Sequence, residues 1–182
     1  MTWNAFHNRG EILRSAIDAA NARQDGTLPM DLPGIRDQFR DELDLLSALM
    51  LKWHARLSGQ VERELMAQPM DLEHAVASAW RRTCDEMPGV RLIIDQYTAN
   101  PLDHEMSAAL HRAQEREWWK LAAAAGASND ESHAAARAGA RVEAVARTMG
   151  PVADVPEAEL AEAAANAVHG SFIDRIRAVL AA

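Results

Sequence analysis

The stretch from Ile35 to Gln68 constrains the fold of this chain most strongly. Its apolar residues recur every three or four positions, and they are Ile35, Phe39, Leu43, Leu46, Met50, Trp53, Leu57 and Val61. Their mean spacing of about 3.7 residues is the period of an α-helix. No proline or glycine interrupts the pattern before Gly59. The stretch therefore predicts one long central helix, roughly 50 Å in length at about 1.5 Å per residue, against which other helices can pack.

Apolar stripes and helix breaks elsewhere in the chain predict about seven to eight helices in all. The expected ranges outside the central helix are 4–23, 72–87, 90–100, 103–126, 129–150, 156–169 and 171–180. Asp71 is the expected N-cap of the helix that follows it, and Ser128 with Glu131 forms a Ser-x-x-Glu capping box. No segment alternates apolar and polar residues as a half-buried strand does. The predicted fold class is therefore an all-α, multi-helix bundle.

The length of 182 residues fits a single helical domain. Within it, residues 1–126 are expected to form the main bundle. Residues 127–182 are expected to form C-terminal helices that pack on this bundle or on a second subunit. A lone cysteine, Cys84, leaves no internal disulfide and fits a reducing compartment. Neither a signal peptide nor a membrane span is apparent, so the expected location is cytoplasmic.

Charge argues against a nucleic-acid partner. The chain has 19 basic and 27 acidic residues, a formal net charge of −8, and the acidic residues are spread along the sequence. A polyanion would be repelled on average. We therefore expect neither nucleic-acid nor membrane binding.

Catalytic and metal-binding motifs are scarce. The sequence contains no Gly-x-Ser-x-Gly, P-loop or dinucleotide fingerprint, and no cofactor is expected. On a helix, His104, His111 and Glu115 lie on one stripe, as metal ligands could, but this stripe is opposite the apolar face. It defines the alternative hypothesis, a metal-dependent helical-bundle enzyme. Cys84 lies on an apolar stripe and is expected to be a buried, inert thiol.

Large aromatic and sulfur-containing side chains indicate where a ligand could bind. Trp53 and Trp80 lie on apolar stripes with Met50 and Met87, and such side chains either fill a core or line an adaptable cavity. Glu117 interrupts an apolar face, so its carboxylate must pair with a base, reach solvent or contact a ligand. The candidate ligand-binding residues are Met50, Trp53, Trp80, Met87, Tyr97 and Glu117.

Trp118 and Trp119 lie away from the apolar face of the helix predicted at 103–126. Something must cover them, because large exposed apolar patches are uncommon on monomers. A homodimer with these tryptophans near the interface is the prediction. The alternative is that the alanine-rich helix at 129–150, or the C-terminal pair of helices around Leu160, Phe172 and Ile176, covers them within one chain.

Part of the sequence resembles a known family. The run from Phe39 to Leu46, continuing through Trp53-His54-Ala55-Arg56-Leu57 to Glu62-Arg63-Glu64-Leu65, is similar to the first ligand-domain helix of tetracycline-repressor-like (TetR) regulators. The resemblance covers about 110 residues, and it implies a helical domain that binds a small apolar molecule and dimerises. Gly26 and Phe39 are separated only by the segment from Thr27 to Gln38, which contains two prolines. Two short helices with a turn need roughly twenty residues, so no helix-turn-helix DNA-binding unit fits there.

These observations lead to one hypothesis about function. The chain is interpreted as a non-enzymatic helical binding protein that holds a small apolar ligand or a protein partner and does not bind DNA. The metal-dependent enzyme based on His104, His111 and Glu115 remains the alternative.

Overall fold

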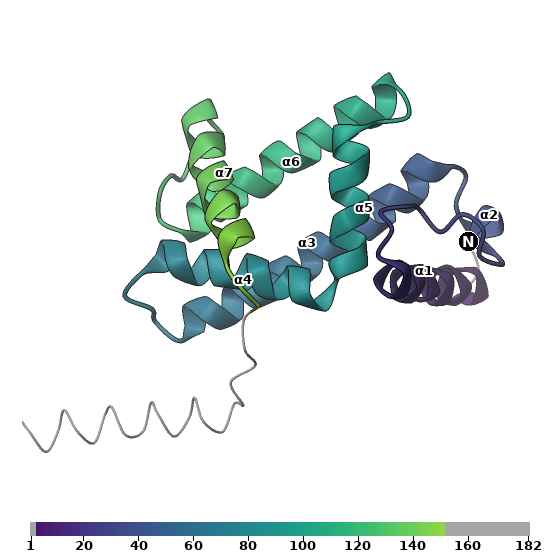
Figure 1. Cartoon of the computed structure of the whole chain (residues 1–182), viewed down its shortest axis with the longest axis horizontal. Coiled ribbons are helices and arrows are strands. Elements are labelled where there is room, and N and C mark those ends of the chain that lie inside the picture. Colours follow the sequence, from purple (N-terminus) through teal and green to yellow (C-terminus); the bar gives the residue numbers. More distant parts are fainter. Residues whose placement is uncertain (1–2, 152–182) are drawn as a thin grey trace, which may run out of the picture. The chain divides into compact units, whose positions relative to one another are not determined.

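A computed structural model describes residues 3–151, and this part of the chain is helical without β-strands. Figure 1 shows its seven helices, which are α1 (Trp3–Arg23), α2 (Ile35–Gln38), α3 (Glu42–Met66), α4 (Leu72–Glu86), α5 (Pro88–Ala99), α6 (His104–Ala124) and α7 (His133–Thr148). The predicted all-α class is confirmed. The helices expected at 156–169 and 171–180 lie outside the described residues.

The single helix predicted from Ile35 to Gln68 is wrong at its N-terminal end. After the four-residue α2, Phe39 adopts an extended conformation, with φ −123° and ψ 125°. The side chain of Asp41 then caps α3 by accepting a 2.8 Å hydrogen bond from the backbone N–H of Asp44. Ile35 and Phe39 are nevertheless buried, at 0% and 1% exposure. Their spacing in the sequence predicted their burial correctly, but it could not show that the helix is interrupted at Phe39.

Short polar side chains fix where the other helices begin. Asp71 caps α4 by accepting from the N–H of His74, which confirms that prediction, and Asp103 caps α6 in the same way. The predicted Ser128–Glu131 capping box is wrong. Ser132 is the N-cap of α7, because its side chain accepts from the N–H of Ala135.

Four helices pack side by side around the candidate site that is described below. Helix α3 packs along α4, α4 along α7, and α7 along α6, while α3 and α6 touch over a short stretch (Figure 1). Helix α1 packs against α5. The largest fully buried side chains include those of Trp53, Trp80, Phe39, Leu46, Ile93, Met106 and Leu121.

The contact between α6 and α7 is unusually close at one point. A Cβ atom added to Gly139 of α7 would lie 1.9 Å from the carbonyl oxygen of Trp118 on α6. Only glycine lets two helix backbones approach to this distance. The residue therefore sets how deeply α7 lies against α6, and with it the position of the charged side chains that α7 carries.

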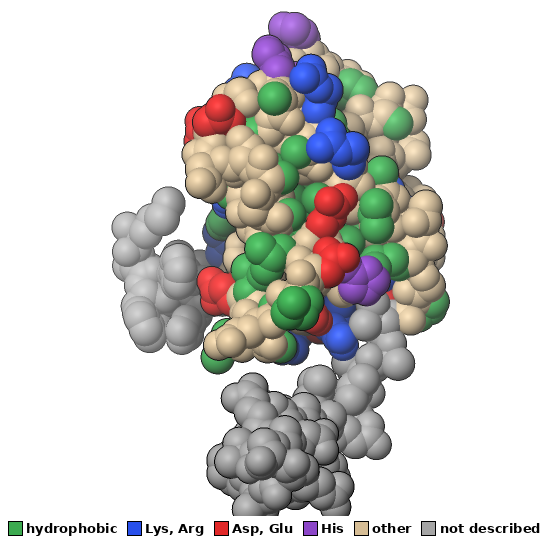
Figure 2. Space-filling view, turned by 90° about the vertical axis from the view of Figure 1, so that its left-hand side faces the viewer, with side chains coloured by type: hydrophobic (Ala, Val, Ile, Leu, Met, Phe, Trp, Pro, Cys, Tyr) green, Lys and Arg blue, Asp and Glu red, His purple; other side chains and the backbone are tan. Residues whose placement is uncertain are grey.

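Charges on the surface are intermingled. Figure 2 shows one face, on which acidic, basic and apolar side chains lie next to one another without a continuous basic patch. Within residues 3–151, no helix combines the length and the apolar character needed to cross a lipid bilayer.

Candidate functional site

A buried carboxylate, that of Glu117 on α6, lies at the centre of the candidate site. Its Oε2 atom accepts a 2.9 Å hydrogen bond from the indole Nε1 of Trp53 and lies 2.8 Å from Nε2 of His54. Its Oε1 atom accepts a 3.0 Å hydrogen bond from Nε1 of Trp80 and lies 3.6 Å from a guanidinium nitrogen of Arg91. Helices α3, α4, α5 and α6 each contribute one or more of these groups. Both oxygens of Glu117 are thus engaged by groups of its own chain, through three hydrogen bonds and the ion pair with Arg91.

Two opposing effects determine the pKa of Glu117. Burial raises the pKa, because a charge is poorly solvated in a protein interior. The hydrogen bond with His54, the positive charge of Arg91 and the hydrogen bond from Trp80 outweigh burial, so the pKa lies below its ordinary value. Glu117 is therefore an ionised acceptor at neutral pH.

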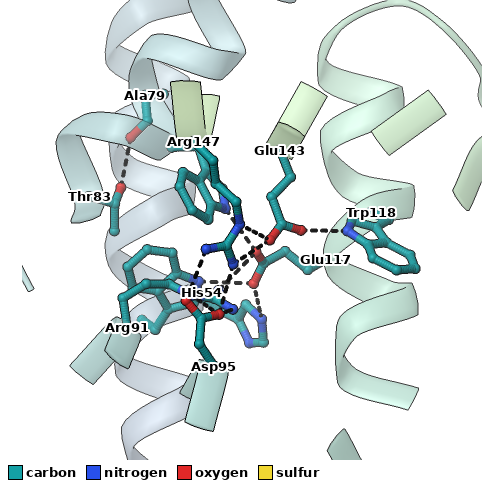
Figure 3. A network of polar contacts seen from close by, with 11 residues as sticks. His54, Ala79, Thr83, Arg91, Asp95, Glu117, Trp118, Glu143 and Arg147 are labelled. Carbon is teal, nitrogen blue, oxygen red and sulfur yellow. Dashed lines mark hydrogen bonds and ion pairs between the residues drawn. The ribbon is translucent and has the colours of Figure 1, made fainter. Parts of the chain in front are cut away.

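A second cluster of charges continues from Arg91 toward α7. Arg91 donates to Asp95 over 2.5 and 2.9 Å. Arg147 of α7 binds the same carboxylate through two nitrogens, at 2.7 and 2.9 Å, and also donates to Glu143. Figure 3 shows Glu117 and Glu143 reaching from α6 and α7 toward these two arginines. Charges that are far apart in the sequence thus neutralise one another where four helices meet.

Aromatic rings hold the two arginines in place. The guanidinium group of Arg91 lies 5.0 Å from the ring centroid of Trp53 and 5.5 Å from that of Trp80. The guanidinium group of Arg147 lies 4.9 Å from the ring centroid of Trp80. The two indoles meet edge to face, with centroids 5.7 Å apart. Each arginine therefore combines a cation–π contact with its ion pairs.

The ion pairs also shift the pKa values of their members. Burial raises the pKa of Asp95, but hydrogen bonds from Arg147 and Arg91 outweigh it and lower the pKa below its ordinary value. The hydrogen bond to Asp95, together with the one to Glu143, raises the pKa of Arg147 despite partial burial. Both residues remain charged over the physiological range.

A groove of about 210 Å³ lies between α3 and α6 and ends at Glu117 and His54. Its walls are formed by Leu57, Val61 and Leu121. Exposed polar side chains also border it, and these are Ser58, Glu62 and Lys120. We call this the Leu57 groove. It combines apolar walls with a small number of polar groups, which is the composition typical of small-molecule sites.

A second groove lies on the other side of His54. Its volume is about 200 Å³, and it is lined by Leu43, Ser47, Met50, Leu51, His54, Ala109, Leu110 and Ala113. We call it the Leu51 groove, after a leucine that is 69% exposed. His54 borders both grooves, and its side chain is 23% exposed. The imidazole is thus the polar group of the site that a molecule in either groove can reach.

A smaller cavity of about 10 Å³ lies beneath these grooves, bordered by His54, Arg91, Glu117 and Glu143 among others. This volume corresponds to about one water molecule. The polar lining supplies the partners that a buried water needs, but the cavity is too small for a ligand.

The sequence-predicted site residues are only partly brought together. Glu117 borders the Leu57 groove and Met50 the Leu51 groove. Trp53 and Trp80 are 0% and 1% exposed, and their indoles donate to Glu117 from within the core. Met87 is a buried core residue and Tyr97 a half-buried one at its edge, and neither borders the two grooves.

Several residues of the site were missed at the level of sequence. They are His54, Arg91, Asp95, Glu143 and Arg147. A usable signal existed for Arg91 and Asp95, and for Glu143 and Arg147, because each pair is spaced by four residues and an i,i+4 ion pair is expected on a helix. His54 carried no such signal, since its partner is 63 positions away.

The stripe proposed for a metal does not assemble into a ligand set. Nδ1 of His111 lies 3.6 Å from Glu115, and the histidine side chain is 72% exposed. No group of three or more His, Cys, Asp or Glu side chains within residues 3–151 is arranged to hold a metal ion. His104 therefore does not complete the site of the alternative hypothesis.

Cys84 is partly buried beside the two arginines of the network. Burial raises the pKa of its thiol to about 12, although nearby Arg91 and Arg147 act in the opposite direction. The thiol is protonated at neutral pH, in agreement with the inert role expected for it.

Helix α7 covers both tryptophans that were expected near a dimer interface. Nε1 of Trp118 donates to Glu143 over 2.6 Å, and Nε1 of Trp119 donates to the backbone carbonyl of Ser132 over 3.1 Å. Trp119 also packs against alanines of α7. This is the intrachain arrangement that was the alternative to an interface, and self-association itself stays a prediction.

Comparison of the chain with protein-family models, with curated proteins and with solved structures found no match. The resemblance to tetracycline-repressor-like regulators stays a prediction, and the function has to be argued from the site.

Proposed function

We propose that this protein binds a small, largely apolar molecule with one polar end, and that the molecule occupies the Leu57 groove. The observation that carries the proposal is the composition of this groove. Three apolar side chains form its walls, and an imidazole anchored on a buried carboxylate lies at its inner end. An apolar body gains free energy by leaving water, and one polar group fixes its orientation.

The cost of building the site supports a binding role. Burying the charge of Glu117 is unfavourable, and three hydrogen bonds and one ion pair from three other helices compensate for it. A core filled with apolar side chains would need none of these groups. The polar groups around Glu117 hold His54 in one position beside the groove. Such preorganisation favours binding.

The volume of the groove limits the ligand. Its 210 Å³ lies below the roughly 300–1,000 Å³ of pockets that hold drug-sized ligands. A short-chain or single-ring compound fits this limit. Larger molecules would have to extend past His54 into the Leu51 groove.

The proposal is tested by screening purified protein against small apolar compounds by thermal shift, and by native mass spectrometry of protein taken directly from cells. A ligand present at 100 times its dissociation constant stabilises the folded state by about 2.7 kcal/mol. We expect a compound of the stated size to raise the melting temperature. The absence of any stabilising compound and of any co-purified molecule would contradict the proposal.

A matched pair of variants locates the binding. Ser58 borders the Leu57 groove and is exposed, so Ser58→Trp places a large ring in the groove without disturbing the core. Ala55 is exposed on the same helix and borders neither groove. Ser58→Trp should abolish the thermal shift, and Ala55→Trp should leave it unchanged. Equal responses from both variants would place the ligand elsewhere.

A further inference from the structure

The hydrogen bond between His54 and Glu117 determines what the imidazole offers to a ligand. Three of the four groups around the Glu117 carboxylate, the two indoles and the guanidinium, can only donate hydrogen bonds. A carboxylate surrounded in this way is ionised and accepts from its fourth neighbour as well. Nε2 of His54, at 2.8 Å, must therefore carry a proton.

A proton on Nε2 leaves the other ring nitrogen bare in the neutral imidazole. Nδ1 of His54 then has a lone pair and acts as a hydrogen-bond acceptor. The hydrogen bonds of the described residues include none to this atom, while the ring borders both the Leu57 groove and the Leu51 groove. Nδ1 is thus the atom of the imidazole that is left to accept a hydrogen bond from a ligand.

Charges around the groove disfavour an anionic ligand at this end. The Glu117 carboxylate lies directly behind the imidazole. Glu62 and Lys120 border the groove farther out and carry opposite charges, so they roughly cancel. Both oxygens of Glu117 are already engaged by its own chain, through three hydrogen bonds and the ion pair with Arg91.

We infer that the ligand of the Leu57 groove is a small apolar compound that carries an N–H or O–H donor and no negative charge, and that it donates to Nδ1 of His54. This inference rests on the proposed function, because it specifies the chemistry of the molecule held in that groove. Neutral alcohols and protonated amines share this chemistry. Carboxylates of the same length do not.

The first test concerns the imidazole alone. NMR of protein labelled with ¹⁵N-histidine distinguishes protonated from bare ring nitrogens, and the resonances of His54 are identified by their loss in His54→Phe. In the neutral imidazole, we expect a proton on Nε2 and a bare Nδ1. A proton on Nδ1 would overturn the inference without touching the proposed function.

The second test uses three unbranched probes of six carbon atoms each: hexan-1-ol, hexan-1-amine and hexanoate. Binding is measured by NMR titration of the full-length protein, with the Leu57, Val61 and Leu121 methyl groups as reporters. The alcohol and the amine should bind at least about fivefold more tightly than hexanoate, the difference expected for one hydrogen bond. Hexanoate binding as tightly as the other two would overturn the inference, although the groove would still be a binding site. No binding by any probe would instead contradict the proposed function.

Two variants link the preference to His54. His54→Phe keeps a ring in the groove but removes the acceptor, so the difference between the alcohol and hexanoate should disappear. His54→Gln retains an amide that can donate to Glu117 and an oxygen that can accept from a ligand, and it should restore part of the preference. An unchanged preference in His54→Phe would overturn the inference. If this variant does not fold, His54→Gln and the NMR of the unmodified protein decide the question.

Discussion

The backbone carbonyl of Trp118 and the Cα atom of Gly139 lie so close together that a Cβ on Gly139 would come within 1.9 Å of the carbonyl oxygen. This contact lets α7 lie deep against α6, and it allows Glu143 and Arg147 of α7 to reach the network around Glu117. The packing of two helix backbones and the charge pairing of the site are therefore parts of one arrangement.

Gly139→Ala should destabilise the protein strongly, because the backbone of α6 cannot move away as a flexible side chain could. We expect a loss of more than about 3 kcal/mol in the free energy of unfolding, as for other severe overpacking. Gly59 is the matched control, since it lies in the helix α3 with nothing within 4 Å of an added Cβ. Gly59→Ala should stabilise the protein by about 0.5–1 kcal/mol. Urea denaturation of both variants measures the difference, and a mild effect of Gly139→Ala would contradict the close contact.

Glu117→Gln should be far more damaging than the same change at a surface glutamate of α6. The amide nitrogen cannot accept hydrogen bonds, so it leaves buried donors of Trp53, Trp80 or His54 unpaired and the charge of Arg91 less compensated. Breaking a buried ion pair in this way costs about 3–5 kcal/mol. Glu115→Gln is the control, because within residues 3–151 the ion pair of Glu115 is with the exposed His111. Chemical denaturation followed by tryptophan fluorescence, to which Trp53 and Trp80 contribute, provides the measurement. Equal stability of the two variants would show that the network contributes little.

Arg147→Lys should lower stability although it conserves the charge. Lysine cannot bind Asp95 through two nitrogens while also donating to Glu143, and it lacks the planar group that lies over Trp80. The side chain is 41% exposed, so we expect a loss of only about 1–2 kcal/mol. Arg141→Lys on the same helix should change stability by less than about 0.5 kcal/mol, because Arg141 is exposed and binds no carboxylate in the described part of the chain. Thermal unfolding monitored by circular dichroism compares the two.

Stability should fall as the pH is lowered below the ordinary pKa values of two carboxylates of the network, about 4.5 for Glu117 and 3.8 for Asp95. The folded-state pKa of each lies below that value. The unfolded chain therefore binds protons first, and stabilisation that is present at higher pH is lost as the pH falls through the folded-state pKa. Urea unfolding between pH 7 and pH 3 measures this dependence. Asp95→Asn should reduce its slope below pH 5, and an unchanged slope would show that Asp95 is not involved.

Trp118→Ala should lower the free energy of unfolding, because Trp118 packs beneath α7 and bonds to Glu143. We expect about 2–3 kcal/mol, somewhat less than for a fully buried tryptophan, since this residue is half-buried. Chemical denaturation of the variant measures the loss. Little change in stability combined with weaker self-association would instead place Trp118 at an interface.

Self-association is measured separately. Sedimentation equilibrium of the unmodified protein at ~50 μM tests the predicted homodimer, whose apparent mass depends on concentration. A single species near 20.0 kDa would refute it.

The sequence by itself determined the helical class and most helix boundaries. Apolar side chains at a spacing of three and four residues, with caps such as Asp71 and Asp103, are local features, and helices form from local hydrogen bonds. The same local information misplaced the start of α3. It predicted burial at Ile35 and Phe39 correctly, but one stripe of buried residues fits a continuous helix as well as a helix interrupted at Phe39.

Only the tertiary structure decided the site. The sequence marked Glu117 as an acid that needs a partner, and it placed Trp53 and Trp80 on apolar stripes. It could not join Glu117 to His54, which lies 63 positions away, or to Trp80, which lies 37 away. Pairing across helices depends on which faces pack and how closely, and here a glycine against a backbone carbonyl sets that distance between α6 and α7. The network formed because a buried charge must be compensated by whichever donors the packing brings to it.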